Sequence, residues 1–403
     1  MIRALLVALA IGPAALAQSF DDLARVPPPY PYDIDFDNHL LHLHPEVNYA
    51  PHPDWLAAWE RDRLGHGGVL GTFGSTAVDE LLVDARWALN PDLGSGVRLR
   101  NDILWQEWRH LPHERQQIWL GLEQRLWRGL GAVIQAVPAE DKEWIDVRLG
   151  GLWASPDRRQ YVQLLYRRDE IVHDSKSERG GTTIQRPEGV DWLLRLARGE
   201  WSLYSRGRWL READRVYDDP ARAPVIAGHR YAGNEALVRL RWRPVARAQL
   251  ELAWRLVEDA QTRTYRGDAT AYDHEFSGRY RTLGLRGLLP LDRRWRLRGE
   301  LHHVARRVAV TGWRPLRHAR DEWLPAIVVE RRWNERSWLE LGYLGTFYGY
   351  TDTARGDDRD DGAKLELGAV VGLEAGSALK ASLSHQVTRG RFGGFNLRLI
   401  TWF

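Results

Sequence analysis

The sequence ends in FNLRLITWF, residues 395–403, and this stretch decides how the rest of the chain is interpreted. Side chains alternate between the two faces of a β-strand, so the odd-numbered residues from Phe395 to Phe403 share one face and Arg398 lies on the other. Most domains leave their last residues polar and loosely held. The apolar terminus therefore predicts a final strand that belongs to the fold.

This strand resembles the closing strand of Gram-negative outer-membrane β-barrels, which ends in Phe and presents alternate apolar residues to lipid. The resemblance implies that Phe403 is part of an assembly signal read by the barrel-assembly machinery. It also implies contact with outer-membrane lipids and lipopolysaccharide. A buried final strand of a soluble β-sandwich is the alternative that the stretch itself allows.

The N-terminus has the order of a secretory signal peptide. Arg3 precedes an apolar run over residues 4–10, and Ala15-Leu16-Ala17 offers an A-x-A cleavage site. We predict a signal peptide at 1–17, a periplasmic leader or partial plug at 18–78, and an outer-membrane barrel at 79–403. Residues 26–31 are proline-rich and 54–60 are helix-like, so the leader is expected to be irregular.

The amino-acid composition fits a membrane barrel, although the mean hydropathy alone would suggest a soluble protein. The mean hydropathy is negative, −0.47, but only every second residue of a barrel strand faces lipid, which dilutes the signal. Twenty Trp and 14 Tyr against 8 Phe favour rings with a polar group, which suit the boundary between hydrocarbon and headgroups. The chain has no cysteine, so disulfides cannot stabilise it.

From about residue 79, alternating segments are separated by connections that are short and long in turn, the order of a membrane barrel with tight periplasmic turns and longer external loops. The fold class predicted is an all-β, single-chain antiparallel transmembrane β-barrel of about 16 strands, with 14 or 18 as alternatives. The strands are expected near 79–89, 97–107, 117–136, 143–153, 159–167, 190–198, 201–210, 229–242, 248–257, 278–289, 294–305, 322–332, 338–350, 363–374, 378–388 and 395–403. If 117–136 is two strands, the glycine-rich stretch 68–74 joins them and the count becomes 18.

The strand face opposite the apolar one is rich in arginine, which predicts a positive lumen. Its acidic residues are fewer, so part of the positive charge is expected to face water and attract anions. A structural ladder of mutually neutralising Arg–carboxylate pairs is the alternative. The anion-binding candidates are Arg98, Arg100, Arg148, Arg195, Arg206, Arg208, Arg239, Arg241, Arg296 and Arg298.

Aromatic side chains share that face, at Trp144, Tyr161, Tyr204, Tyr280 and Trp338. Rings beside guanidinium groups can hold sugars that carry carboxylates. The sequence therefore favours an outer-membrane channel for anionic solutes, with acidic oligosaccharide or polysaccharide as the candidate solute. The alternatives are a non-conducting barrel for surface-polysaccharide assembly or attachment and, ranked lower, an outer-membrane lipid-modifying enzyme.

No catalytic constellation emerges from the sequence. Ser384 and His385 are adjacent and point to opposite sides of the wall, and no G-x-S-x-G, Walker or Rossmann motif is present. The basic residues follow strand alternation and form no single patch, which argues against a nucleic-acid partner. We therefore predict no enzyme activity, no cofactor and no metal site, and the sequence leaves the oligomeric state open.

Overall fold

The computed structural model describes residues 67–402, apart from 76–81, 109–112, 139–144, 157–158, 170, 176–180, 186, 212, 217–227, 245–247, 267–270, 312–315, 335–336, 353–355, 374–376 and 389. The predicted signal peptide, most of the predicted leader and Phe403 lie outside this range. The described chain is built of β-strands. Among these residues, no helix is long and apolar enough to cross a membrane.

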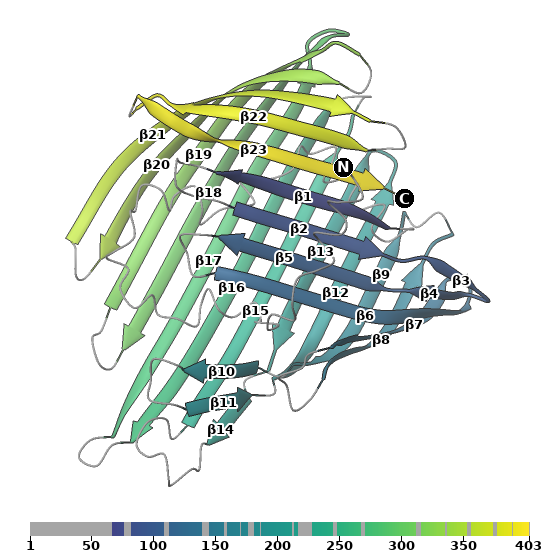
Figure 1. Cartoon of the computed structure of the whole chain (residues 1–403), viewed down its shortest axis with the longest axis vertical. Helices are drawn as coiled ribbons and strands as arrows, with labels where there is room; N and C mark the ends of the chain where they lie inside the picture. The colour runs from purple at the N-terminus through teal and green to yellow at the C-terminus, as the bar shows by residue number, and fades with distance from the viewer. Residues whose placement is uncertain are drawn as a thin grey trace, which may run out of the picture.

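The strands follow one another in an almost unbroken series (Figure 1). The first twelve are β1 (Gly67–Ser75), β2 (Leu82–Leu89), β3 (Asp92–Gly94), β4 (Val97–Leu99), β5 (Asn101–Trp108), β6 (His113–Trp127), β7 (Leu130–Val137), β8 (Asp146–Ala154), β9 (Tyr161–Arg168), β10 (Ile171–Ser175), β11 (Gly181–Gln185) and β12 (Glu188–Arg198). The others are β13 (Trp201–Leu210), β14 (Ala213–Val216), β15 (Gly228–Trp242), β16 (Gln249–Arg266), β17 (Ala271–Pro290), β18 (Trp295–Thr311), β19 (Leu316–Arg332), β20 (Trp338–Asp352), β21 (Gly356–Gly372), β22 (Ala378–Gln386) and β23 (Arg391–Trp402).

Eighteen of the described strands form the barrel wall, and their antiparallel pairings return to the starting strand. The wall runs through β1, β2, β5 to β9, β12, β13 and β15 to β23, and β1 pairs both β2 and β23. Figure 1 shows β23 beside β1 at this seam, where the rings of Phe73 and Phe395 lie 5.6 Å apart. The barrel fold is confirmed, and the count of 16 is corrected to the alternative of 18.

Two segments account for the corrected count. The stretch 117–136 is two strands, β6 and β7, because Arg128 and Gly129 have φ angles of +45° and +84° and reverse the chain in a tight turn. The glycine-rich stretch 68–74 is strand β1. Since β1 begins at Gly67, part of the range predicted as leader, 18–78, belongs to the wall.

The strands of the second half are longer than predicted. β16 has 18 residues and β17 has 20, and the acidic stretch 351–362, which lies between the strands expected near 338–350 and 363–374, is mostly strand. Polar residues on both faces do not prevent backbone pairing, so the ladder continues past the apolar part of these strands. The short connection between β19 and β20, by contrast, lies at 333–337, between the strands expected near 322–332 and 338–350.

The outer face of the wall is apolar. Leu164, Ile327 and Leu367 lie within their strands, away from the strand ends, and are 59%, 58% and 61% exposed. Trp127, Trp201 and Trp295 lie where strands meet the short turns, as expected for an aromatic girdle at a membrane boundary. An outward apolar band of this kind requires lipid around it.

Candidate functional site

The inner wall of the barrel is the candidate site, because all ten arginine candidates lie on its face. In their strands, buried or partly buried side chains alternate with exposed outer ones, and the arginines occupy the inner positions. Six of them, Arg98, Arg100, Arg208, Arg241, Arg296 and Arg298, are less than 9% exposed. The other four, Arg148, Arg195, Arg206 and Arg239, are partly exposed.

A continuous chain of ion pairs, which we call the ionic belt, crosses the inner wall from β15 to β22. Its members lie close to the short turns of their strands. The pairs are Arg241–Glu251 at 2.7 Å, Glu251–Arg286 at 3.7 Å, Arg286–Glu300 at 3.1 Å, Glu300–Arg298 at 2.8 Å, Arg298–Glu330 at 3.2 Å, Arg298–Glu340 at 3.4 Å, Arg296–Glu330 at 2.5 Å, Glu340–Lys380 at 2.6 Å and Lys380–Glu366 at 3.2 Å.

The ionic belt is balanced, with five cations and five carboxylates. In this part of the wall the structure therefore favours the ladder of neutralising pairs. Glu330, which sequence reasoning did not place in the lumen, accepts hydrogen bonds from Arg296 and Arg298. It was missed because β19 contains the run LPAIVV, residues 324–329, which is apolar on both faces and hides the alternation.

A second charged group lies across β4 to β12. Arg100 approaches Glu123 at 3.6 Å and donates hydrogen bonds to Tyr161 and Gln163, both at 3.3 Å. Arg98 pairs with Asp92 at 3.8 Å. Glu123 was also missed, because it lies in the segment 117–136 that was treated as one interrupted strand.

Asp191 of β12 joins two arginines of the neighbouring strands. Arg148 contacts it at 2.7 Å and Arg167 at 3.3 Å. The same two guanidinium groups lie over the ring of buried Trp119, at 3.6 and 5.5 Å from its centroid. Stacking of this kind adds to the charge attraction and holds the forks in place. Trp119 had no place among the sequence candidates.

Between these two groups, four inner-wall side chains stand in register on neighbouring strands. Tyr161 of β9 is opposite Arg195 of β12, Arg195 is opposite Tyr204 of β13, and Tyr204 is opposite Arg239 of β15. The Arg239 guanidinium is 5.9 Å from the centroid of the Tyr204 ring. We call this set the Arg–Tyr row. Arg206 lies one inner position further along β13.

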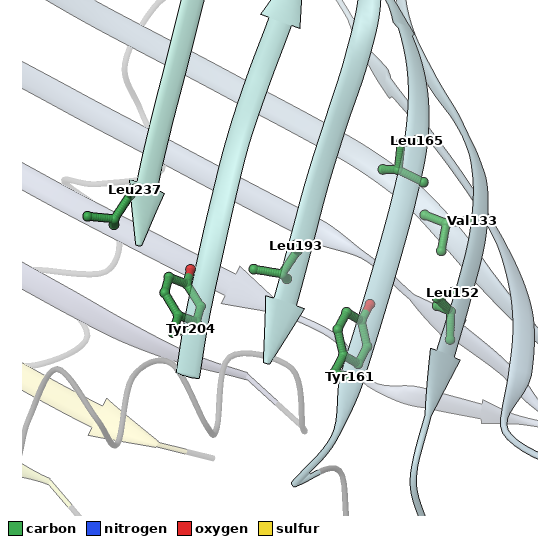
Figure 2. Close-up of a cluster of buried hydrophobic side chains, with 7 residues drawn as sticks. All are labelled: Val133, Leu152, Tyr161, Leu165, Leu193, Tyr204 and Leu237. Carbon is green, nitrogen blue, oxygen red and sulfur yellow. The ribbon is translucent and has the colours of Figure 1, made fainter. Parts of the chain in front are cut away.

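Apolar residues surround the Arg–Tyr row on the same wall. Figure 2 shows their side chains projecting from adjacent strands on one stretch of wall. This apolar cluster comprises Val133, Leu152, Tyr161, Leu165, Leu193, Tyr204 and Leu237, each 7% exposed or less.

The aromatic candidates lie in different parts of the wall. Tyr161 and Tyr204 belong to the apolar cluster, and the Tyr161 hydroxyl donates to Gln163 at 2.7 Å. Trp338 is buried beside the ionic belt, and its indole nitrogen donates to Glu340 at 2.7 Å. Trp144 and the side chain of Tyr280 lie outside what the structure describes, as does Phe403. Within the described residues, no group of His, Cys, Asp and Glu is arranged to hold a metal ion.

The sequence matches no protein-family model. It also matches no curated protein sequence. Among solved structures, the chain is similar to a bacterial polysaccharide outer-membrane secretin, with 12% identity, 84% of this chain and 97% of that chain covered, and a TM-score of 0.40. It is also similar to OccAB3 of Acinetobacter baumannii, at 11% identity, 83% and 97% coverage and a TM-score of 0.40. A third similarity is to a loop-deletion mutant of OmpT, an outer membrane protein of Vibrio cholerae, at 10% identity, 84% and 98% coverage and a TM-score of 0.38. Similarity at this level identifies no functional residue of this chain.

Proposed function

We propose that this protein is an outer-membrane channel whose inner wall favours anionic solutes, with acidic oligosaccharides or polysaccharides as the solute class. The Arg–Tyr row carries this proposal, because it places guanidinium groups and phenol rings alternately on neighbouring strands of the inner wall. Neighbouring strands are about 4.8 Å apart, so the row extends roughly 15 Å along the wall. That length suits an extended chain better than a single small ion.

The charge of this part of the wall supports the same conclusion. Positive side chains exceed negative ones on the inner faces of β12, β13 and β15, in contrast to the balanced ionic belt. Outside the ionic belt, the arginines there are Arg195, Arg206, Arg208 and Arg239, and the carboxylates in the same strand alternation are Asp191 and Glu235. An excess of one sign in a concave site raises the local concentration of the opposite ion.

The two residue types of the row have complementary roles in binding an acidic sugar. A guanidinium group is planar and offers two parallel hydrogen bonds to a carboxylate. A phenol ring offers an apolar face on which a sugar ring can stack, together with a hydroxyl group. Their alternation along the Arg–Tyr row matches a polymer whose sugar faces and carboxylates also alternate.

The ionic belt favours a second function, a structural or surface-polysaccharide assembly and attachment barrel that does not conduct. A wall whose cations are paired with carboxylates is rigid, and it creates no net electrostatic field in the lumen that would attract ions of one sign. The two functions differ in one measurable property, the passage of ions through the lumen.

Planar-bilayer recordings of the mature chain under a salt gradient test the proposal. We expect a reversal potential of the anion-selective sign. Replacing Arg195, Arg206 and Arg239 together by glutamine should move that potential toward zero, because the three charges line the lumen. The effect should be largest at low ionic strength, where the Debye length reaches about 30 Å at 0.01 M.

The matched control replaces three exposed arginines on outer-wall or turn positions, Arg281, Arg293 and Arg331, by glutamine. This control removes the same charge from the protein and should leave the reversal potential unchanged. A cation-selective potential, or equal effects of the two triple variants, would refute the anion-favouring wall. A folded barrel that conducts neither with nor without its N-terminal residues would favour the attachment function.

A further inference from the structure

The apolar cluster is buried although it lies on the inner face of a single-layer wall. Tyr161, Leu165 and Val133 are at most 1% exposed, and Leu193 and Leu237 are 5% and 6% exposed. A barrel of this many strands encloses a lumen wide enough for water, and apolar side chains are unfavourable against water. A cover on the lumen side would stabilise these apolar side chains by excluding water from them.

The cluster lies near the end of the barrel at which the N-terminal chain joins the wall. β1 starts at Gly67, and successive wall strands alternate in direction. β9 and β13 run in the same direction as β1, so Tyr161 and Tyr204, near their starts, lie toward the end that holds Gly67. Residues 18–66 precede β1, and an extended chain of that length reaches well over 100 Å, by roughly 3.3 Å per residue. This segment can therefore cross the lumen to the cluster.

The composition of residues 18–66 complements the wall. The segment has nine acidic residues and three basic ones, although the whole precursor has a net charge of +3. Within it, DIDFD at 33–37 alternates carboxylates with Ile34 and Phe36. Further on, DWLAAWE at 54–60 places Trp55 and Trp59 four residues apart, on one side if the piece is helical.

We propose that the segment 33–60 lies inside the barrel, with Asp33, Asp35 and Asp37 against the arginines of the Arg–Tyr row and Trp55 and Trp59 over the apolar cluster. The opposite charges bring the acidic stretch to the row, and the apolar rings cover the leucines. The segment thereby occupies the place that the proposed function gives to an anionic solute. In this respect the inference rests on that function, but the position of the segment inside the barrel does not depend on whether the barrel conducts.

Thiol labelling tests the position directly, because the chain has no cysteine of its own. Leu193→Cys places one thiol in the centre of the apolar cluster, and Ser95→Cys places a control thiol in the exposed turn between β3 and β4. Each is labelled in the full mature chain with a membrane-impermeant maleimide, and in a chain that lacks residues 19–60. We expect removal of the segment to raise the labelling rate at position 193 about tenfold or more, the ratio given by covering contacts worth about 1.4 kcal/mol. The rate at position 95 should not change.

Equal labelling rates at position 193 in the two chains would overturn the proposal, provided that heat-modifiable migration shows both barrels folded. If the deletion does not fold, the full chain carrying Asp33→Asn, Asp35→Asn and Asp37→Asn with Trp55→Ala and Trp59→Ala decides the question by the same labelling. A failure of anion selectivity with protected labelling would refute the proposed function and leave the position of the segment standing.

Discussion

Arg298 should be the costliest arginine of the ionic belt to remove. It contacts Glu300 at 2.8 Å, Glu330 at 3.2 Å and Glu340 at 3.4 Å, and its side chain is 10% exposed. Arg298→Gln removes the cation that these three buried carboxylates share. The neighbouring acids then repel one another in a region shielded from water.

The expected loss of unfolding free energy follows from the ion pairs that the three carboxylates keep after the substitution. Removing one partner of a buried ion pair costs about 3–5 kcal/mol of unfolding free energy. After Arg298→Gln, Glu300 keeps Arg286 at 3.1 Å, Glu330 keeps Arg296 at 2.5 Å and Glu340 keeps Lys380 at 2.6 Å. Because each carboxylate keeps one cation, we expect a loss near the lower end, about 3 kcal/mol.

The assay is urea unfolding of the barrel in lipid vesicles, followed by tryptophan fluorescence. The matched control is Arg307→Gln, which breaks an exposed pair with Asp321 at 2.7 Å whose side chains are 49% and 48% exposed. We expect a loss of about 0–1 kcal/mol there. The double variant Arg298→Gln/Glu340→Gln restores the charge balance and should recover about 1–2 kcal/mol of the loss. A loss at Arg298 no larger than at Arg307, or strictly additive losses in the double variant, would refute the reasoning.

Three further predictions concern the wall and its assembly. Gly129→Ala should cost about 2 kcal/mol or more by urea unfolding, because φ is +84° and the new Cβ would lie 2.2 Å from the Ala154 carbonyl oxygen. Gly199→Ala, at φ +57° with no atom within 4 Å of the new Cβ, should cost less, and equal losses would contradict the packing argument. Leu164→Arg places a charge on the lipid face and should cost about 2–4 kcal/mol in vesicles, whereas an unchanged midpoint would mean that lipid does not contact this face. Deleting Phe403 should lower the folded fraction in outer membranes at constant synthesis of precursor, measured by heat-modifiable migration, and an unchanged fraction would count against its role in assembly.

The wall could be predicted from sequence where one face of a strand is apolar and the other polar. In β23, Leu397 is exposed on the outside while Asn396 and Arg398 are buried on the inside, as the alternation predicts. The prediction failed where that contrast disappears. The parts of β16 and β17 next to their connection are polar on both faces and resemble a loop in sequence. β1 is rich in glycine, which offers no side chains to alternate.

The lumen chemistry was harder to predict because ion pairing depends on register between strands that are far apart in sequence. Arg296 and Glu330 are separated by 34 residues and become partners only through the pairing of β18 with β19. Counting charges on clearly alternating strands identified the arginines but missed Glu123 and Glu330. The excess of positive charge was therefore overestimated for the ionic belt, while the register Tyr161, Arg195, Tyr204 and Arg239 could not be derived without the strand pairings.

The two proposals together constrain the kind of anion that can use the Arg–Tyr row. A tethered acidic stretch with three carboxylates, Asp33, Asp35 and Asp37, acts at an effective concentration in the millimolar range, far above that of most free solutes. A free solute with one carboxylate forms one guanidinium contact and cannot replace the contacts that the tethered stretch makes with both arginines of the row. A solute with several carboxylates at regular spacing gains the same multivalency and can displace the segment from Arg195 and Arg239. Competition with the chain's own acidic residues thus favours polymers over small acids, because the segment sets the minimum number of contacts that a solute must make.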